Sequence, residues 1–171
     1  MQDQYAGDIG DYGKFGLLRA LECNDLSVGI NWYYVLSSKT GNHANDGKFK
    51  IAKEYFVCDP ELASELYHIS NLNEGSRSVE KLERAKLLKT SLYYREPVAD
   101  ANGRRKWQQN AVDRLNAAEV VFLDPDNGLI TNSIKRSSKK CVKYVLDEEI
   151  EASSGSVGRN ESLIWQQGRD I

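Results

Sequence analysis

The hydrophobic positions of the chain gather in short runs that are rich in β-branched and aromatic residues and end at polar or turn-forming residues. Runs of this length and composition are typical of β-strands. We therefore expect strands at 28–36, 55–58, 92–94, 120–123 and 162–165. The run at 120–123, Val-Val-Phe-Leu, has no polar position and predicts a strand buried on both faces.

Between these runs, hydrophobic residues recur at helical spacing, as Trp107, Ala111 and Leu115 do. We expect helices at 11–22, 59–70, 77–89, 104–117 and 142–151. Strands that alternate with helices predict a Rossmann-like three-layer α/β sandwich with a mostly parallel sheet of about five strands. The whole chain, 1–171, is expected to form a single domain of this class.

Composition excludes several function classes. The 171 residues are 40% hydrophobic and 28% charged, with a net charge of −2, so the chain as a whole does not attract polyanions. No apolar run approaches the roughly 20 residues of a membrane-spanning helix, and we expect no membrane partner. The three cysteines are widely spaced, which favours reduced thiols in a cytoplasmic protein over a disulfide framework or a zinc site.

The most informative segment is 124–128, Asp-Pro-Asp-Asn-Gly, a predicted turn directly behind the strand at 120–123. Open α/β sheets bind ligands where their strands end, so Asp124, Asp126 and Asn127 are candidate catalytic residues. In one interpretation the turn cradles an amine or a cofactor, with Asp124 as acceptor. In a second, Asp124 and Asp126 bind magnesium. The structural alternative is a cap followed by a tight turn.

A second candidate site is the Gly-rich segment that contains Asp8, Gly10, Asp11 and Lys14. Glycines let main-chain amides approach a ligand closely, and a helix N-terminus favours anions, so these residues are candidates for cofactor binding. The segment matches neither the Walker loop nor the dinucleotide fingerprint. A closely packed helix that uses glycine for contact explains it equally well.

Two polar segments complete the candidates. Asn42, His43 and Asp46 follow the first expected strand and would lie at the same edge of a parallel sheet, where they could hold a cofactor. The alternative for His43 is a solvated side chain. A basic run then follows the Asp124 turn and could dock the phosphates of a nucleic acid, although a solvated loop is the default for such a run. Its members are Lys135, Arg136, Lys139 and Lys140.

The motifs DIGDYGKFGLLR at 8–19 and VFLDPDNGL at 121–129 resemble a family of uncharacterised bacterial and phage proteins. More distantly, the strand followed by Asp-Pro-Asp-Asn is similar to the Asp/Asn-Pro-Pro-Tyr loop of S-adenosylmethionine-dependent amino-methyltransferases. That resemblance implies that Asp124 accepts hydrogen bonds from the target amine. It departs at Asp126, where the family has a second proline, and at Asn127, where it has an aromatic residue. The length implies a minimal or shortened methyltransferase-like fold.

Three functions follow as hypotheses. The first is a methyltransferase-like protein that binds S-adenosylmethionine, a nucleoside cofactor, and modifies nucleic acid. The second is a magnesium-dependent phosphodiesterase or nuclease that uses Asp124 and Asp126, joined by Asp8 or Asp11. The third is a non-catalytic binding protein of a phage or mobile element.

Overall fold

The computed structural model describes residues 1–36, 51–72, 76–89, 92–155 and 161–164. The chain divides into two compact units that alternate along the sequence. Unit 1 comprises Met1, Asp25–Val35 and Thr90–Ile171, and unit 2 comprises Gln2–Asn24 and Leu36–Lys89. This division into units does not test whether residues 1–171 form a single domain, which stays a prediction.

Unit 1 is built on a parallel sheet in the order β2-β1-β3-β4. The strands are β1 (Val28–Asn31), β2 (Leu92–Tyr94), β3 (Val120–Leu123) and β4 (Glu161–Ile164). Every residue of β1 and of β3 is buried, as the unbroken apolar run at 120–123 predicts. Their register pairs Asn31 with Leu123, so both strands end at the same edge of the sheet.

The α/β class and the parallel sheet agree with the sequence, but the expected sheet of about five strands is wrong. The sheet of the described residues has four strands. The expected three-layer, methyltransferase-like sandwich, which assumed about five strands, is therefore wrong as well. The missing strand is 55–58, where the chain forms the 3₁₀ helix η2 (Lys53–Val57). Tyr55 and Val57 are 37% and 84% exposed, so this run lacks the burial that a core strand requires.

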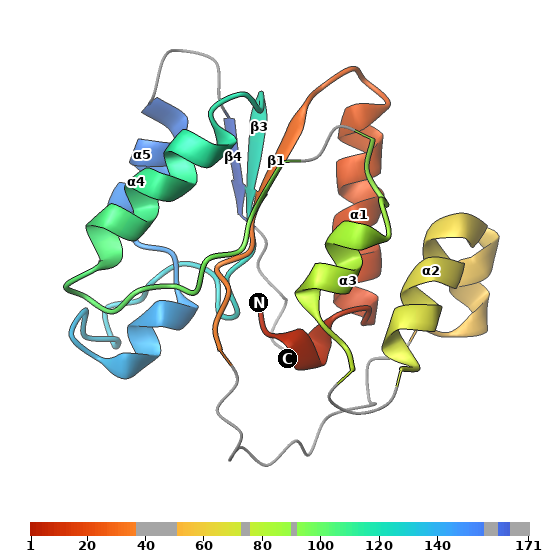
Figure 1. Cartoon of the computed structure of the whole chain (residues 1–171), viewed down its shortest axis with the longest axis horizontal. Helices are drawn as coiled ribbons and strands as arrows, with labels where there is room; N and C mark the ends of the chain where they lie inside the picture. Colours follow the sequence, from red (N-terminus) through yellow and green to blue (C-terminus); the bar gives the residue numbers. More distant parts are fainter. Residues whose placement is uncertain (37–50, 73–75, 90–91, 156–160, 165–171) are drawn as a thin grey trace. The chain divides into compact units, whose positions relative to one another are not determined.

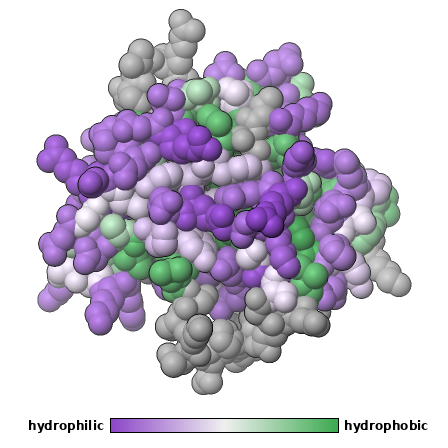
Figure 2. Space-filling model, viewed as in Figure 1, coloured by the Kyte–Doolittle hydropathy of each residue, from purple (hydrophilic) through white to green (hydrophobic). Residues whose placement is uncertain are grey.

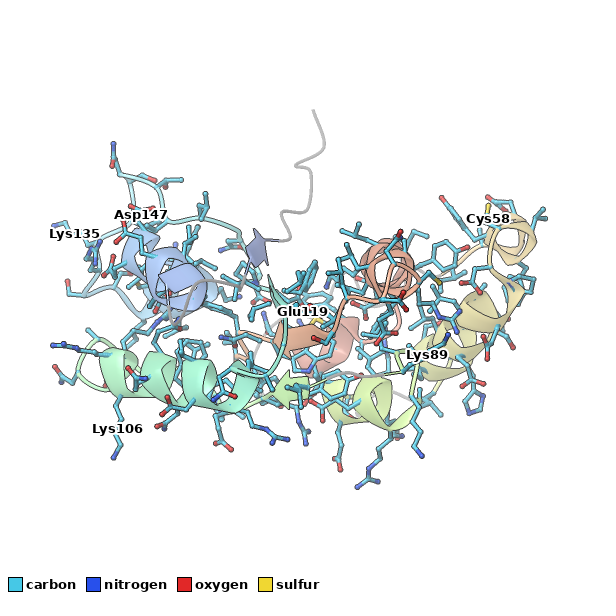
Figure 3. All side chains as sticks on the ribbon, turned by 90° about the horizontal axis from the view of Figure 1, so that it is seen from above. Cys58, Lys89, Lys106, Glu119, Lys135 and Asp147 are labelled. Carbon is cyan, nitrogen blue, oxygen red and sulfur yellow. The ribbon has the colours of Figure 1, made fainter. Side chains whose placement is uncertain are left out.

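Two helices of unit 1, α4 (Arg104–Leu115) and α5 (Asp147–Gly155), lie side by side against the sheet (Figure 1). The crossovers through them, β2 to β3 and β3 to β4, run in the same direction across the sheet, and right-handed crossovers then place both helices on one face. Trp107, Ala111 and Leu115 face the core as their spacing predicts, whereas the side chain of Lys106 points outward from α4 (Figure 3). The expected helix at 142–151 is instead the 3₁₀ helix η3 (Lys139–Lys143) followed by α5.

Unit 2 contains the 3₁₀ helices η1 (Asp3–Tyr5) and η2 and the helices α1 (Ile9–Glu22), α2 (Pro60–Ser70) and α3 (Val79–Arg84). Asp59 caps α2 by accepting from the Leu62 N–H, and Pro60 is its first residue. Arg19 of α1 binds both carboxylate oxygens of Asp59, at 2.9 and 2.8 Å. This bidentate pair ties α1 to the start of α2.

The surface is largely hydrophilic on the face drawn in Figure 2, where hydrophobic atoms show only as small separate patches among the coloured residues. None of the helices that the structure describes has both the length and the apolar character needed to cross a membrane.

Candidate ligand site at the carboxyl edge of the sheet

The strand order of unit 1 creates a switch point between β1 and β3. From β1 the chain leaves to β2 on one side, and it returns to β3 on the other. Asp124 follows β3 directly, and its N–H donates to the carbonyl of Asn31 at 2.9 Å. Ligands of open α/β sheets bind at the carboxyl ends of strands that flank such a point. The sequence therefore predicted the place of the Asp124 loop correctly.

The loop at 124–128 is held firmly. Asp124 is 2% exposed. The N–H of Asn127 donates to the Lys143 carbonyl at 3.0 Å, and the N–H of Val145 donates to the carbonyl of Gly128 at 3.0 Å. Gly128 has a φ of 75°, a left-handed conformation that a side chain would strain. The segment thus forms the turn that its sequence predicts. Asn127 contributes its main chain to that turn, and its side chain is exposed.

Oxygen atoms of the switch point converge on one amino group. The ammonium of Met1 donates to the carbonyls of Trp32 at 3.0 Å, Tyr33 at 3.1 Å and Asp124 at 3.1 Å. It also forms an ion pair with Oδ1 of Asp126 at 3.0 Å. The carboxyl edge therefore presents four acceptors in an arrangement that suits a primary amine.

This arrangement weakens the magnesium interpretation. The second carboxylate oxygen of Asp126 lies 3.4 Å from Nζ of Lys143, so both its oxygens face cations of the protein. Across the described ranges, no group of three or more His, Cys, Asp or Glu residues could hold a metal ion.

Tyr33 connects this edge to the helices of unit 1. Its φ of 44° is uncommon for a residue with a side chain, and its N–H donates to Oδ1 of Asn31 at 3.2 Å. Its hydroxyl donates to Oε2 of Glu149 at 3.1 Å. Strained residues of this kind cluster at functional sites, where the surrounding contacts hold them.

A buried ion pair underlies these contacts. Arg104 binds Glu149 through two bonds, of 2.5 and 2.9 Å, and its guanidinium also donates to the Tyr144 carbonyl. Burial, followed by the charge of Glu149, raises the pKa of the Tyr33 phenol well above its ordinary value. Burial alone would lower the pKa of Arg104, but its bonds to Glu149 raise it. Glu149 is therefore the shared partner of a cation and a neutral phenol.

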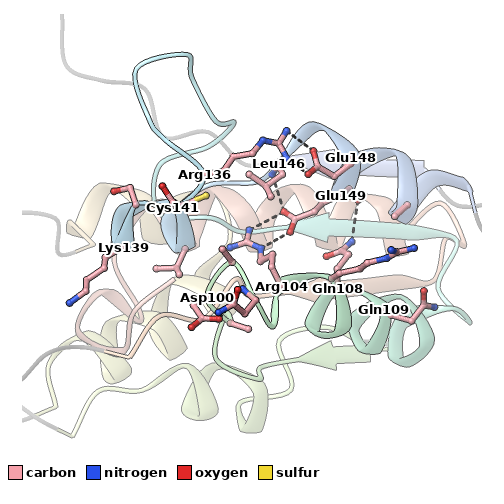
Figure 4. Close-up of a pocket in the computed structure, with 18 of the residues that line it drawn as sticks. Asp100, Arg104, Gln108, Gln109, Arg136, Lys139, Cys141, Leu146, Glu148 and Glu149 are labelled. Atoms are coloured by element: carbon pink, nitrogen blue, oxygen red, sulfur yellow. Dashed lines mark hydrogen bonds and ion pairs between the residues drawn. The ribbon is translucent and has the colours of Figure 1, made fainter.

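A cavity of about 870 Å³ opens beside this pair (Figure 4). It is lined by residues of 99–105 before and in the first turn of α4, by residues of 108–112 further along α4, by residues of 136–142, and by residues of 146–152 before and in α5. Because α4 follows β2 and the segment before α5 follows β3, the cavity belongs to the carboxyl edge of the sheet. Its volume is typical of sites for small molecules.

The Gly-rich segment forms the start of α1 in unit 2. Asp8 caps the helix by accepting from the Asp11 N–H at 3.0 Å. Asp11 is fully buried and accepts from the Gly7 N–H at 2.7 Å and from Nζ of Lys14 at 3.0 Å. Gly10 is buried in the same turn. These contacts are those of a closely packed helix start, and cofactor binding by these residues stays a prediction.

Burial also shifts the titration of this segment. It raises the pKa of Asp8 to about 6, and the charge of Asp11 adds to the effect. The cations Lys14 and Arg77 oppose it. A carboxyl group with this pKa changes its charge close to neutral pH.

The remaining candidates fall in two places. Asn42, His43 and Asp46 lie outside the described residues. The basic run is exposed, and within it Arg136 pairs with Glu148 of α5. That pair raises the pKa of Arg136 and, against a smaller opposing effect of burial, lowers that of Glu148.

Sequence reasoning missed the residues that organise the cavity. Arg104, Gln108 and Glu149 are each more than nine-tenths buried, although all three are polar. A signal was present in Arg104-Arg105-Lys106, because basic residues oppose the dipole at the start of a helix.

Comparisons with known proteins identify no relative. No protein-family model, no curated protein and no solved structure matches the chain.

Proposed function

We propose that this protein binds a nucleoside cofactor at the switch point between β1 and β3 and acts as a methyltransferase-like protein on an amine. The observation that carries the proposal is the set of four oxygen atoms around the Met1 ammonium. S-adenosylmethionine is the first candidate, because its amino acid part offers a primary amine to such acceptors.

Acceptors held by strand ends suit the amino group of the cofactor. The carbonyls of Trp32 and Tyr33 belong to the chain directly behind β1, and Asp124 directly behind β3. Groups fixed in this way hold the amino group of the cofactor in one orientation, so the cofactor is positioned before the reaction. A ligand amine would replace the Met1 ammonium at these oxygens.

Nucleic acid is the proposed target class. Lys135, Lys139 and Lys140 are exposed and carry charges that could contact phosphates. Binding through such contacts weakens steeply as salt rises. We expect the wild-type protein to be retained on single-stranded or duplex DNA, with retention that falls as salt is added. The variant Lys135→Ala/Lys139→Ala/Lys140→Ala should be retained less. Equal retention of the variant excludes this target.

Calorimetric titration with S-adenosylmethionine tests the cofactor, first in metal-free buffer and then with magnesium. We expect wild-type binding with a Kd below about 1 mM and a weakening of at least about tenfold in Asp126→Asn, which removes the charge of the one side-chain acceptor among the four. Asp113→Asn, an exposed carboxylate on α4, is the matched control and should bind as the wild type does. Circular dichroism establishes that the variants are folded. Absence of wild-type binding, or equal binding by Asp126→Asn, contradicts the proposal.

A further inference from the structure

The first turn of α4 places three cations at the positive end of the helix dipole. It consists of Arg104, Arg105 and Lys106, contains no acidic residue, and has Gly103 as an N-cap without a side-chain bond. Helices normally favour acids at this end, because the free N–H groups carry partial positive charge. Of these three cations, Arg104 forms an ion pair with Glu149. This turn therefore breaks a local rule, and such places are often functional.

Four cations from the described residues line the cavity. Among its lining residues, Arg104 pairs with Glu149 and Arg136 pairs with Glu148 (Figure 4). Two further cations, Arg105 and Lys139, line the same cavity and are exposed. Among the remaining lining residues, the acid is Asp100. Its Oδ1 accepts hydrogen bonds from the N–H groups of Asn102 and Gly103. The balance favours an anion at the mouth.

A buried acceptor lies deeper in the wall. Gln108 is 6% exposed, and its amide nitrogen donates to the Glu149 carbonyl at 3.2 Å and to Oγ of Ser153 at 3.0 Å. Its oxygen, Oε1, is buried and has no hydrogen-bond partner among the described residues. A buried acceptor left without a donor destabilises the fold, so a ligand N–H or O–H that reaches it gains that contact.

The rest of the wall is suited to a flat apolar surface. Val112, Val142 and Leu146 line the cavity together with Gln108. A ligand that fits the whole set is anionic at one end and carries an N–H donor on a planar ring at the other. Nucleotides combine these features.

We infer that the cavity between α4, η3 and α5 binds a nucleoside monophosphate. Its phosphate lies against Arg105, Lys139 and the open first turn of α4. Its base packs on the apolar wall and donates to Oε1 of Gln108. Nucleotide binding in this cavity does not depend on whether the β1–β3 edge binds S-adenosylmethionine.

Titration with AMP, GMP, CMP and UMP, and with inorganic phosphate, tests this site. We expect at least one nucleotide to bind with a Kd below about 1 mM, and inorganic phosphate to bind at least about tenfold more weakly. The variant Arg105→Ala/Lys139→Ala should lose at least about tenfold in affinity. Its matched control is Lys106→Ala/Lys135→Ala, which removes the same charge at two lysines that do not line the cavity and point outward (Figure 3).

The base contact has its own test. Val112→Trp fills the cavity from a half-buried position, so it should block nucleotide binding while the protein stays folded by circular dichroism. Three results overturn the inference: no nucleotide binds, the two double variants lose affinity equally, or inorganic phosphate binds as tightly as the nucleotides do. Binding of S-adenosylmethionine that persists in Val112→Trp separates this site from the proposed cofactor edge.

Discussion

The hydroxyl of Tyr33 donates to Oε2 of Glu149 at 3.1 Å, although the two residues are 116 positions apart in the chain. The same tyrosine offers its main-chain carbonyl to the amine at the β1–β3 edge. Its ring packs edge-on against Trp107 of α4, with centroids 5.0 Å apart. Tyr33 therefore joins the switch point to the helices that line the cavity.

Removal of the Glu149 charge should destabilise the protein strongly. In Glu149→Gln, Arg104 remains buried without a charged partner, and Leu146 and Tyr33 lose the carboxylate that they bind. We expect a loss of about 3 kcal/mol in the free energy of unfolding, measured by chemical denaturation. Glu148→Gln, which breaks the exposed pair with Arg136, should cost less than about 1 kcal/mol. Similar losses in the two variants would show that the buried pair is not the main contribution.

Two glycines of unit 2 should respond to alanine in opposite directions. Gly7 has a φ of +83°, and a Cβ there would lie 2.9 Å from the carbonyl oxygen of Leu66 and from the nitrogen of Ser70. Gly7→Ala should therefore destabilise by more than about 1 kcal/mol. Gly16 lies within α1 with open space around its Cβ position, and Gly16→Ala should stabilise by up to about 1 kcal/mol. Thermal denaturation of both variants measures these changes, and a stabilising Gly7→Ala would contradict the packing described for α1.

The raised pKa of Asp8 should make stability depend on pH. The carboxyl group has an ordinary pKa of 3.8, and in the fold it is about 6. Between these values the folded protein binds more protons than the unfolded chain, so the contribution of Asp8 to stability falls as pH rises from about 4 to about 6. Asp8→Asn keeps a cap acceptor but cannot ionise. Its free energy of unfolding, relative to wild type, should rise across this window and then level off.

Denaturation at several pH values between about 4 and 7 tests this point. The exposed variant Asp25→Asn controls for the loss of one negative charge. A difference between Asp8→Asn and wild type that is constant over the window, or that falls as pH rises, would contradict the raised pKa.

Local sequence patterns predicted the parts of the fold that depend on neighbouring residues. The strand at 120–123 and the turn behind it are where the apolar run and the Asp-Pro-Asp-Asn-Gly segment place them. The cap at Asp59 and the spacing of Trp107, Ala111 and Leu115 also hold in the structure. Period and turn chemistry act within a few residues, which is why sequence reasoning reached them.

Contacts between distant segments were beyond such patterns. The run at 55–58 has strand-like residues, yet it ends at the capped start of α2 and forms η2 instead. The pairing of Arg104 with Glu149 joins two segments that each look solvated on their own. The packing of α4 against α5 brings these charges together, and no local spacing encodes it.

Hydrogen–deuterium exchange with and without S-adenosylmethionine is the sharpest test of the proposed cofactor site, because it locates a ligand as well as detecting one. We expect slower exchange in the segments directly behind β1 and β3, at 32–35 and 124–128, and no such protection in Asp126→Asn. Unchanged exchange of these two segments at a saturating concentration of the cofactor would contradict a nucleoside site at the β1–β3 switch point.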